Sequence, residues 1–166
     1  MRDRQVTIVD GIVYHADAEI IAWVNANMGA GVVAKEAYGF GILDDGWDTE
    51  TALPSLKDAL AAGVYFYDQY DANEDDISDV TACVFIKNKK AIKPHIVKKL
   101  LEYPFNQLGV RRISAMIDEA NIEALDQAQR IGFQVEGYKR KMAPDGRRAV
   151  MLGLLPEDCP YWKAAE

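Results

Sequence analysis

The order of the elements predicted between residues 77 and 155 constrains the fold more than any other feature of the sequence. Apolar, β-branched runs predict strands, and apolar residues spaced three and four apart predict helices. The pattern is strand, helix, strand, helix, strand and strand, over residues 77–86, 94–108, 111–117, 121–131, 134–141 and 147–155. Helices that follow strands in this way cover the faces of a sheet, so we expect one mixed sheet flanked by helices.

The preceding part of the chain adds strands and one clear helix. We expect a helix that Asp17 caps and that runs to about Met28, with Ile20, Ile21, Val24 and Met28 on one face. Strands are expected over residues 5–13 (with a turn at Asp10-Gly11), 37–43 and 61–70. The polar segment 44–56 is expected to be a surface loop, with room for a short helical turn. Strands 61–70 and 77–86, joined by an acidic connector, are typical of an antiparallel hairpin.

The helix predicted over residues 94–108 carries its own boundary signals. Pro94 suits a first helical turn and Gly109 suits a C-terminal cap. Pro104 lies inside the apolar repeat, where a proline costs about 3 kcal/mol, so we expect a kink or an early end there. The next strand, RRISAMI, is expected to be buried on both faces, as a strand in the sheet interior is.

Composition limits the classes of protein that fit. The chain has 166 residues, of which 49% are hydrophobic and 27% charged, which indicates one globular domain over residues 1–166. No apolar run approaches the roughly 20 residues that span a bilayer. The first residues lack a secretion signal and there are only two cysteines, so we expect a cytoplasmic protein without a disulfide framework. A metal site is not expected, because the histidines lie far from the cysteines in sequence.

The net charge of −7 is unevenly distributed. Between Asp44 and Asp79 the chain is strongly acidic, and Lys57 is its one base. Between Lys87 and Lys99 the chain is strongly basic. The acidic part is suited to a cation and the basic part to an anion, although both patterns also fit solvated surfaces without a ligand. Nucleic acid is not expected as a partner, because one basic segment stands in an acidic protein.

The junction NKKAIKPHIV, residues 88–97, is the most informative point for binding. A strand ends there, a basic loop follows, and a helix begins at Pro94. A helix N-terminus offers free N–H groups and the positive end of the helix dipole, which favour phosphate. The lysines would add positive charge without the bidentate geometry of arginine. A basic helix start with no ligand is the alternative, and the local pattern leaves both open.

The chain from Lys87 to Leu155 resembles the acyl-CoA-binding half of the GNAT superfamily of N-acyltransferases. The resemblance is carried by YPFNQLGVRRISAMIDEANIEALDQAQRIGFQVEGYKR, with its strand, Asn, helix, Gly-Phe and strand. Within the superfamily it is most similar to the branch that acetylates protein N-termini and to related bacterial and phage proteins. The resemblance implies an α+β fold with a central, mostly antiparallel sheet flanked by helices. It also implies an acceptor side in residues 1–79 and an acetyl-CoA-binding half in 80–155.

The resemblance implies a set of residues that bind acetyl-CoA. The backbone of one strand would pair with the pantetheine arm, and the following loop would hold the pyrophosphate. Asn121, which is also a good helix N-cap, would reach the pantetheine. The residues implied are Cys83, Val84 and Phe85 in the strand, Asn88, Lys89, Lys90, Ala91 and Lys93 in the loop, and Asn121 at the helix start. Phe133 would anchor the helix to the core.

The chain departs from the family pattern in two places, the loop after the strand and one position of the following helix. The loop has Asn88, Ala91 and Lys93 where the family has Arg or Gln followed by glycines, which let the backbone approach phosphate. Ala128 stands where many members carry the tyrosine that protonates the departing thiolate. The candidates for general base are Asp68 and Asp79. The candidates for the acid are Tyr138, Tyr67 and Cys159, each of which also fits a packing role.

The resemblance implies an N-acetyltransferase that uses acetyl-CoA and a primary amine acceptor, on a protein or a small cationic molecule. The amine would attack the thioester directly, with proximity and backbone N–H groups supplying much of the catalysis. The alternative is an inactive GNAT-like module whose acidic face binds a partner protein. The sequence leaves open whether the protein is a monomer or a homodimer.

Overall fold

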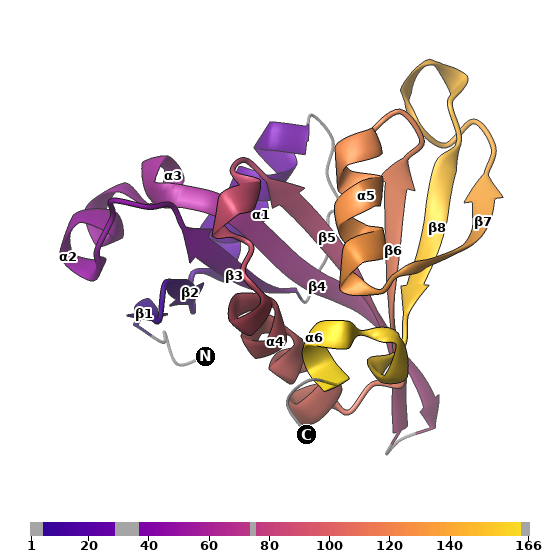
Figure 1. The fold of residues 1–166 in the computed structure, drawn as a ribbon, viewed down its shortest axis with the longest axis horizontal. Coiled ribbons are helices and arrows are strands. Elements are labelled where there is room, and N and C mark those ends of the chain that lie inside the picture. Colours follow the sequence, from indigo (N-terminus) through magenta and orange to yellow (C-terminus); the bar gives the residue numbers. More distant parts are fainter. Residues whose placement is uncertain (1–4, 29–36, 74–75, 164–166) are drawn as a thin grey trace. The chain divides into compact units, whose positions relative to one another are not determined.

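The computed structural model describes residues 5–28, 37–73 and 76–163, without the side chains of residues 72–76 and 163 (Figure 1). The strands are β1 (Thr7–Val9), β2 (Ile12–Tyr14), β3 (Tyr38–Leu43), β4 (Leu60–Asn73), β5 (Asp76–Ile86), β6 (Arg112–Asp118), β7 (Gln134–Lys139) and β8 (Ala149–Leu154). The α-helices are α1 (Asp17–Met28), α2 (Thr49–Ala52), α3 (Leu56–Ala59), α4 (Pro94–Glu102), α5 (Ile122–Ile131) and α6 (Pro160–Lys163).

The strands follow the order β1-β2-β3-β4-β5-β6-β8-β7 in one sheet. The pairs β1–β2, β2–β3, β3–β4, β6–β8 and β7–β8 are antiparallel, and β5–β6 is parallel. A parallel pair needs a crossover, and the helical segment after β5 provides it. The predicted fold class, a mixed and mostly antiparallel sheet flanked by helices, is confirmed.

The described residues divide into two compact units, one within residues 1–68 and 83–96 and the other within 69–82 and 97–166. In the first unit α1 packs on β3 and β4. Ile20 and Val24 are fully buried there, as the helical spacing predicts, whereas Met28 is 44% exposed. Asp17 is the first residue of α1, and its carboxylate accepts the N–H of Gly39 at 2.8 Å, so it fastens the helix to β3.

The segment 44–59 is more ordered than the polar sequence indicates. Where the sequence indicates a loop with a short helical turn, the structure has α2, a 3-10 turn over Leu53–Ser55, and α3. Asp48 starts α2, because its side chain accepts the N–H of Thr51 at 2.9 Å while the Thr51 hydroxyl accepts the N–H of Asp48 at 3.1 Å. This reciprocal pair is a capping box with threonine in the position more often held by Glu or Gln. Leu56 and Ala59 then bury the helical segment against the core.

In the second unit α5 lies beside β6 and β8 (Figure 1). Ala128 of α5 is buried together with Val150 and Leu152 of β8, and Leu125 and Phe133 pack against them. The predicted helix start at Asn121 and the core position of Phe133 are therefore confirmed. The strands predicted over 134–141 and 147–155 are shorter, because Lys141 and Asp145 adopt positive φ and turn the chain.

β6 departs from its prediction in one respect. Ile113 and Ala115 are buried, but Met116 is 36% exposed and Arg112 and Ser114 are half-buried. The expectation of burial on both faces is wrong, because alternate side chains of β6 lie on the polar face of the sheet. This face carries the ion pairs described below.

The helix that begins at Pro94 changes its geometry where the proline predicts. α4 ends at Glu102, and Tyr103–Leu108 continues as a π-helix that contains Pro104. Pro104 has no N–H to donate, and its carbonyl accepts the N–H groups of Gly109 and Val110. Gly109 closes the segment with φ 72°, which a glycine adopts without strain. Within the described ranges, no helix is long and apolar enough to cross a membrane.

Candidate functional site

β5 continues beyond its pairing with β6. The parallel register joins Asp79–Ala82 to Arg112–Ala115, and β5 then runs on to Ile86. Cys83, Val84 and Phe85, the residues expected to meet the pantetheine arm, are thus the first ones after the last pair with β6. Val84 is 45% exposed.

The side chains of Cys83 and Phe85 pack against α1 in the first unit. The Cys83 thiol donates to the Met28 sulfur at 3.5 Å, and the Phe85 ring meets Trp23 edge-on with centroids 5.5 Å apart. Burial raises the pKa of the Cys83 thiol above its usual range. A thiol held neutral is a poor nucleophile, so this cysteine is suited to packing rather than to covalent catalysis.

Tyr67 and Asp68 lie in β4, also in the first unit. Tyr67 is buried against the same core as Cys83, and its ring lies 5.6 Å from that of Tyr65. Burial raises the pKa of Tyr67 to about 12, with smaller electrostatic contributions from Cys83, which ionises only at high pH, and from Asp68. Asp68 is exposed, and its φ of 51° is unusual for a strand residue. Tyr67 and Asp68 are neighbours in the sequence, and the structure places the first in the core and the second at the surface.

The loop after β5 is a compact turn. The N–H groups of Lys87 and Asn88 both donate to the carbonyl of Ala61, and Lys89–Ala91 forms a 3-10 turn. The Asn88 side chain accepts the N–H of Lys90 at 3.1 Å and donates to Asp44 at 2.8 Å. The next N–H groups donate to loop carbonyls: Ala91 to Asn88, Ile92 to Lys89, and Lys93 to Ala91. The N–H groups of Lys90 to Lys93 are thus already paired in this conformation.

A pocket of about 360 Å³ lies next to this loop, entirely within the first unit. Carboxylates form much of its lining, with Trp47, Lys93 and His95 among the other residues. The acidic residues are Asp10, Asp44, Asp45 and Asp48. Four carboxylates beside one lysine favour a cation over an anion inside the pocket. Lys93 therefore contributes to an acidic pocket as well as to the basic loop.

Asn121 is the N-cap of α5 in the second unit. Its Oδ1 accepts the N–H of Ala124 at 3.3 Å, as an N-cap asparagine does. The side chain is exposed, and within the described ranges its Nδ2 donates no hydrogen bond. The amide thus caps the helix with its oxygen and leaves two N–H donors for a ligand.

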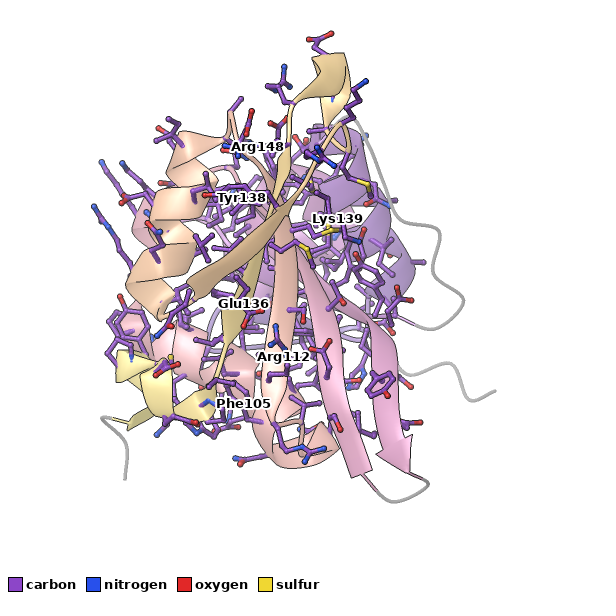
Figure 2. The ribbon with its side chains drawn as sticks, turned by 90° about the vertical axis from the view of Figure 1, so that its right-hand side faces the viewer. Phe105, Arg112, Glu136, Tyr138, Lys139 and Arg148 are labelled. Carbon is purple, nitrogen blue, oxygen red and sulfur yellow. The ribbon has the colours of Figure 1, made fainter. Side chains whose placement is uncertain are left out.

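Asp79 lies in a network of polar side chains on the open face of the second unit. Both of its oxygens lie within hydrogen-bond distance of the Ser114 hydroxyl, at 2.8 and 2.9 Å, and Arg112 approaches at 3.5 Å. Arg112 also donates to both oxygens of Glu136, at 3.0 and 2.5 Å, and Figure 2 shows these two side chains close together. The hydrogen bonds to Arg112 hold the pKa of Glu136 below its usual range. Asp79 is thus tied into an ion-pair network.

Tyr138, the third predicted catalytic residue, lies in β7 and is 50% exposed. The guanidinium of Arg148 sits 4.1 Å from the centre of its ring, and Figure 2 labels both side chains. A cation–π contact at an exposed site is an ordinary stabilising arrangement. Cys159, another candidate acid, is fully buried, and burial raises the pKa of its thiol.

Three solved structures show which known proteins share this architecture. The ribosomal-protein-S5-alanine acetyltransferase of Vibrio fischeri matches with a TM-score of 0.60 and 11% identity, over 94% of this chain and 99% of that one. A mutant of the spermidine N-acetyltransferase SpeG from Vibrio cholerae gives 0.57 and 16%, over 93% and 82%. A GNAT-family acetyltransferase from Streptococcus pneumoniae gives 0.52 and 15%, over 72% and 66%. The chain has the GNAT acetyltransferase fold. The sequence itself matches no protein-family model and no curated protein.

One departure from the GNAT pattern has a structural reason. Ala128, where many members carry a catalytic tyrosine, is 8% exposed and packs against Val150 and Leu152. A tyrosine ring does not fit among these side chains without displacing them. Position 128 of α5 is therefore part of the hydrophobic core in this chain.

The sequence did not reveal the partners that hold several of these residues. Arg112 and Glu136 lie far apart along the chain, and only the strand register brings them together. The same is true of Asn88 and Asp44. Within the described residues, no group of three or more His, Cys, Asp or Glu side chains is arranged to hold a metal ion.

Proposed function

We propose that this protein is an N-acetyltransferase that transfers an acetyl group from acetyl-CoA to a primary amine by direct attack. The observation that carries the proposal is the GNAT fold, matched over 94% of the chain by an acetyltransferase structure. Fold alone does not set an activity, so the proposal also depends on the residues that this chain offers in each unit.

In the first unit, the end of β5 supplies backbone N–H and C=O groups for acetyl-CoA, and the loop that follows supplies positive charge. Cys83–Phe85 come after the last pair with β6, and we assign them the backbone hydrogen bonds to the pantetheine arm. Lys89 and Lys90 are exposed, and their ammonium groups are suited to the pyrophosphate. Because the N–H groups of Lys90 to Lys93 are paired in the loop, phosphate binding here depends more on the lysine side chains than in glycine-rich loops.

In the second unit, Asn121 offers the free donors of its Nδ2 at the start of α5. Pantetheine carries amide carbonyls, which accept such hydrogen bonds, so we assign Asn121 a contact with that arm. An exposed amide at a fixed helix end needs little reorganisation to make this contact.

The chemistry needs one base and one hydrogen-bond donor. The acceptor amine must be unprotonated to attack the thioester carbonyl; the N–C bond forms, the C–S bond breaks, and the amine's proton leaves for a base. Asp68 suits this role better than Asp79, whose oxygens are engaged by Ser114 and Arg112. Tyr67, with its pKa raised to about 12, stays protonated at neutral pH and can donate toward the departing sulfur.

We further propose a cationic amine as the acceptor, in a cytoplasmic setting. The pocket lined by Asp10, Asp44, Asp45 and Asp48 supports a preference for positive charge in the first unit. The acidic connector, residues 71–76, also favours a cation by its sequence. Its Glu74 and Asp75 lie outside the described residues. SpeG acts on spermidine and the Vibrio fischeri enzyme on an alanine of a ribosomal protein. Polyamines and protein N-termini are therefore the first acceptors to test, the latter in keeping with the branch that the sequence resembles.

The proposal is tested by acetyl-CoA binding and thiol release. Calorimetry should give a dissociation constant in the micromolar range, and thiol release should rise when polyamines or N-terminal peptides are added. A control with desulfo-CoA in place of acetyl-CoA should bind without releasing thiol. Binding without any amine-dependent thiol release would contradict catalysis, and absence of binding at millimolar acetyl-CoA would contradict the proposal as a whole.

A second function is favoured by one observation, the pairing of the loop N–H groups with loop carbonyls. A GNAT-fold module that no longer binds acetyl-CoA has no need of free N–H groups there, and its acidic surface would bind a basic partner protein. Replacing Ala91 with glycine separates the two functions. An acetyl-CoA enzyme should keep or improve its affinity when the loop gains a residue that lets the backbone approach phosphate. An inactive module should bind acetyl-CoA neither before nor after the change.

A further inference from the structure

The connection between β6 and α5 is short and is shaped by one carboxylate. Asp118 ends β6, and only Glu119 and Ala120 separate it from Asn121. The Asp118 carbonyl accepts the N–H of Asn121 at 2.9 Å, and its carboxylate accepts the N–H of Ala120 at 2.9 Å. Asp118 thus bonds to both residues that lead into α5, to Ala120 through its carboxylate and to Asn121 through its carbonyl.

Arg147 holds that side chain from the segment that leads into β8. Its Nε donates to Asp118 Oδ1 at 3.0 Å and its Nη2 to Oδ2 at 2.8 Å, which is a bidentate pair. These hydrogen bonds, with that from Ala120, lower the pKa of Asp118 to about 2. At neutral pH the Asp118 carboxylate is therefore charged, and each of its oxygens accepts a hydrogen bond from Arg147.

The next residue on each side is paired in the same way. Arg148 donates through Nε to Glu119 at 2.6 Å, and its carbonyl accepts the N–H of Glu119 at 3.0 Å. Arg148 is itself held by the ring of Tyr138. Asp118 and Glu119 are therefore both tied to the start of β8, directly before the residue that caps α5.

Exposed ion pairs add little to global stability, but a bidentate arginine–carboxylate pair fixes direction as well as distance. An exposed asparagine on a loose loop would lose conformational freedom on binding a ligand. When the loop is already fixed, that loss is smaller and the affinity is higher. Half-buried Arg147 and exposed Arg148 can therefore fix this loop even where they add little to global stability.

We propose that Arg147, acting through Asp118, is a positioning residue that orients Asn121 for its contact with acetyl-CoA. The inference rests on the proposed function, because it needs acetyl-CoA as the ligand. Arg147 itself touches neither the ligand nor the reacting atoms in this account. Its effect should appear in acetyl-CoA affinity rather than in the chemical step.

The test is a double-mutant cycle measured as acetyl-CoA affinity by calorimetry. Asn121→Asp keeps an N-cap oxygen but removes the Nδ2 donors, and should weaken binding about tenfold. Arg147→Met should weaken acetyl-CoA binding about threefold to fivefold. Arg147→Lys keeps the charge but cannot make the bidentate pair, so its affinity should lie between those of Arg147→Met and the wild type. In the Asn121→Asp background, Arg147→Met should have no further effect, because the group it orients is gone.

Arg130→Met is the matched control. Arg130 lies on α5 and pairs with Asp126 at 3.2 Å, so its removal also deletes an arginine ion pair from the second unit. This variant should bind acetyl-CoA as the wild type does. The kcat of Arg147→Met at saturating acetyl-CoA should stay close to the wild-type value while KM for acetyl-CoA rises.

Three results would overturn the positioning role while leaving the proposed function intact. They are fully multiplicative effects of the two changes, an equal loss in Arg130→Met, and unchanged affinity in Arg147→Met. A wild-type protein that does not bind acetyl-CoA would instead overturn the proposed function and this inference together. Hydrogen exchange of the Ala120 and Ala124 amides reports how firmly the Asp118 and Asn121 side chains hold this loop in the absence of ligand. We expect faster exchange of both amides in Arg147→Met.

Discussion

Substituting Gly41 with alanine tests how tightly α1 is packed on the sheet of the first unit. A Cβ at Gly41 would lie 2.5 Å from Leu60 Cδ2, 2.8 Å from Ile20 Cδ1 and 3.3 Å from Val13 Cβ. Leu60 and Ile20 are 1% and 0% exposed, so neither methyl group has free space to move into. The same helix carries the Met28 and Trp23 side chains that contact Cys83 and Phe85.

The magnitude follows from these contacts. Overpacking of a core costs about 1–3 kcal/mol, and two contacts under 3.0 Å place Gly41→Ala within that range. Replacing glycine with alanine also restricts the unfolded chain, which offsets the loss by about 0.4–1 kcal/mol. We therefore expect a net loss of about 1–2 kcal/mol in the free energy of unfolding.

Urea unfolding followed by tryptophan fluorescence measures this loss. Gly137→Ala is the matched control, because a Cβ there meets nothing within 4 Å, and we expect its stability to be unchanged or slightly higher. A Cβ at Gly39 would lie 3.0 Å from Ile20 Cβ, so the stability of Gly39→Ala should fall between those of Gly41→Ala and Gly137→Ala. If Gly41→Ala is as stable as Gly137→Ala, the described packing of α1 on β3 is wrong.

Three further predictions concern titration and reactivity. The folded pKa of Asp118, about 2, lies below its ordinary 3.8, so its contribution to stability is present above pH 4 and lost as pH falls toward 2; the difference in Tm between the wild type and Asp118→Asn should shrink over that range. An ultraviolet titration should show a tyrosine ionising near pH 12 that disappears in Tyr67→Phe, and a normal titration of all tyrosines would contradict the burial of Tyr67. Peptide mass spectrometry after incubation with acetyl-CoA should find no acetyl thioester on Cys83, whose thiol is neutral; an acetylated Cys83 would contradict direct attack.

The parts of the fold that local patterns govern were predictable from the sequence. Pro94, Pro104 and Gly109 mark the start, the change of geometry and the end of one helical segment, because each acts through its own backbone. Asn121 likewise marks the start of α5. Between residues 49 and 59 the sequence indicates no more than a short helical turn, because Thr51 in place of Glu or Gln hides the capping box of Asp48.

The candidate site was predictable in its residue types and much less in their partners. Asp68 and Asp79 look alike in sequence, yet one is exposed in β4 and the other is bound by Ser114 and Arg112. This difference comes from the strand register, which no local pattern encodes. The bidentate pair of Arg147 with Asp118 has the same origin, since it joins positions 29 residues apart.

Acetyl transfer by this protein can be observed by following the acetyl group itself. The protein is incubated with isotope-labelled acetyl-CoA and a mixture of polyamines and N-terminal peptides, and the amines are analysed by mass spectrometry. We expect a labelled N-acetyl group on a cationic primary amine, formed at a rate proportional to protein concentration and strongly reduced in Asp68→Asn. If labelled amide never exceeds the level formed without protein, the GNAT fold here serves a purpose other than acetyl transfer.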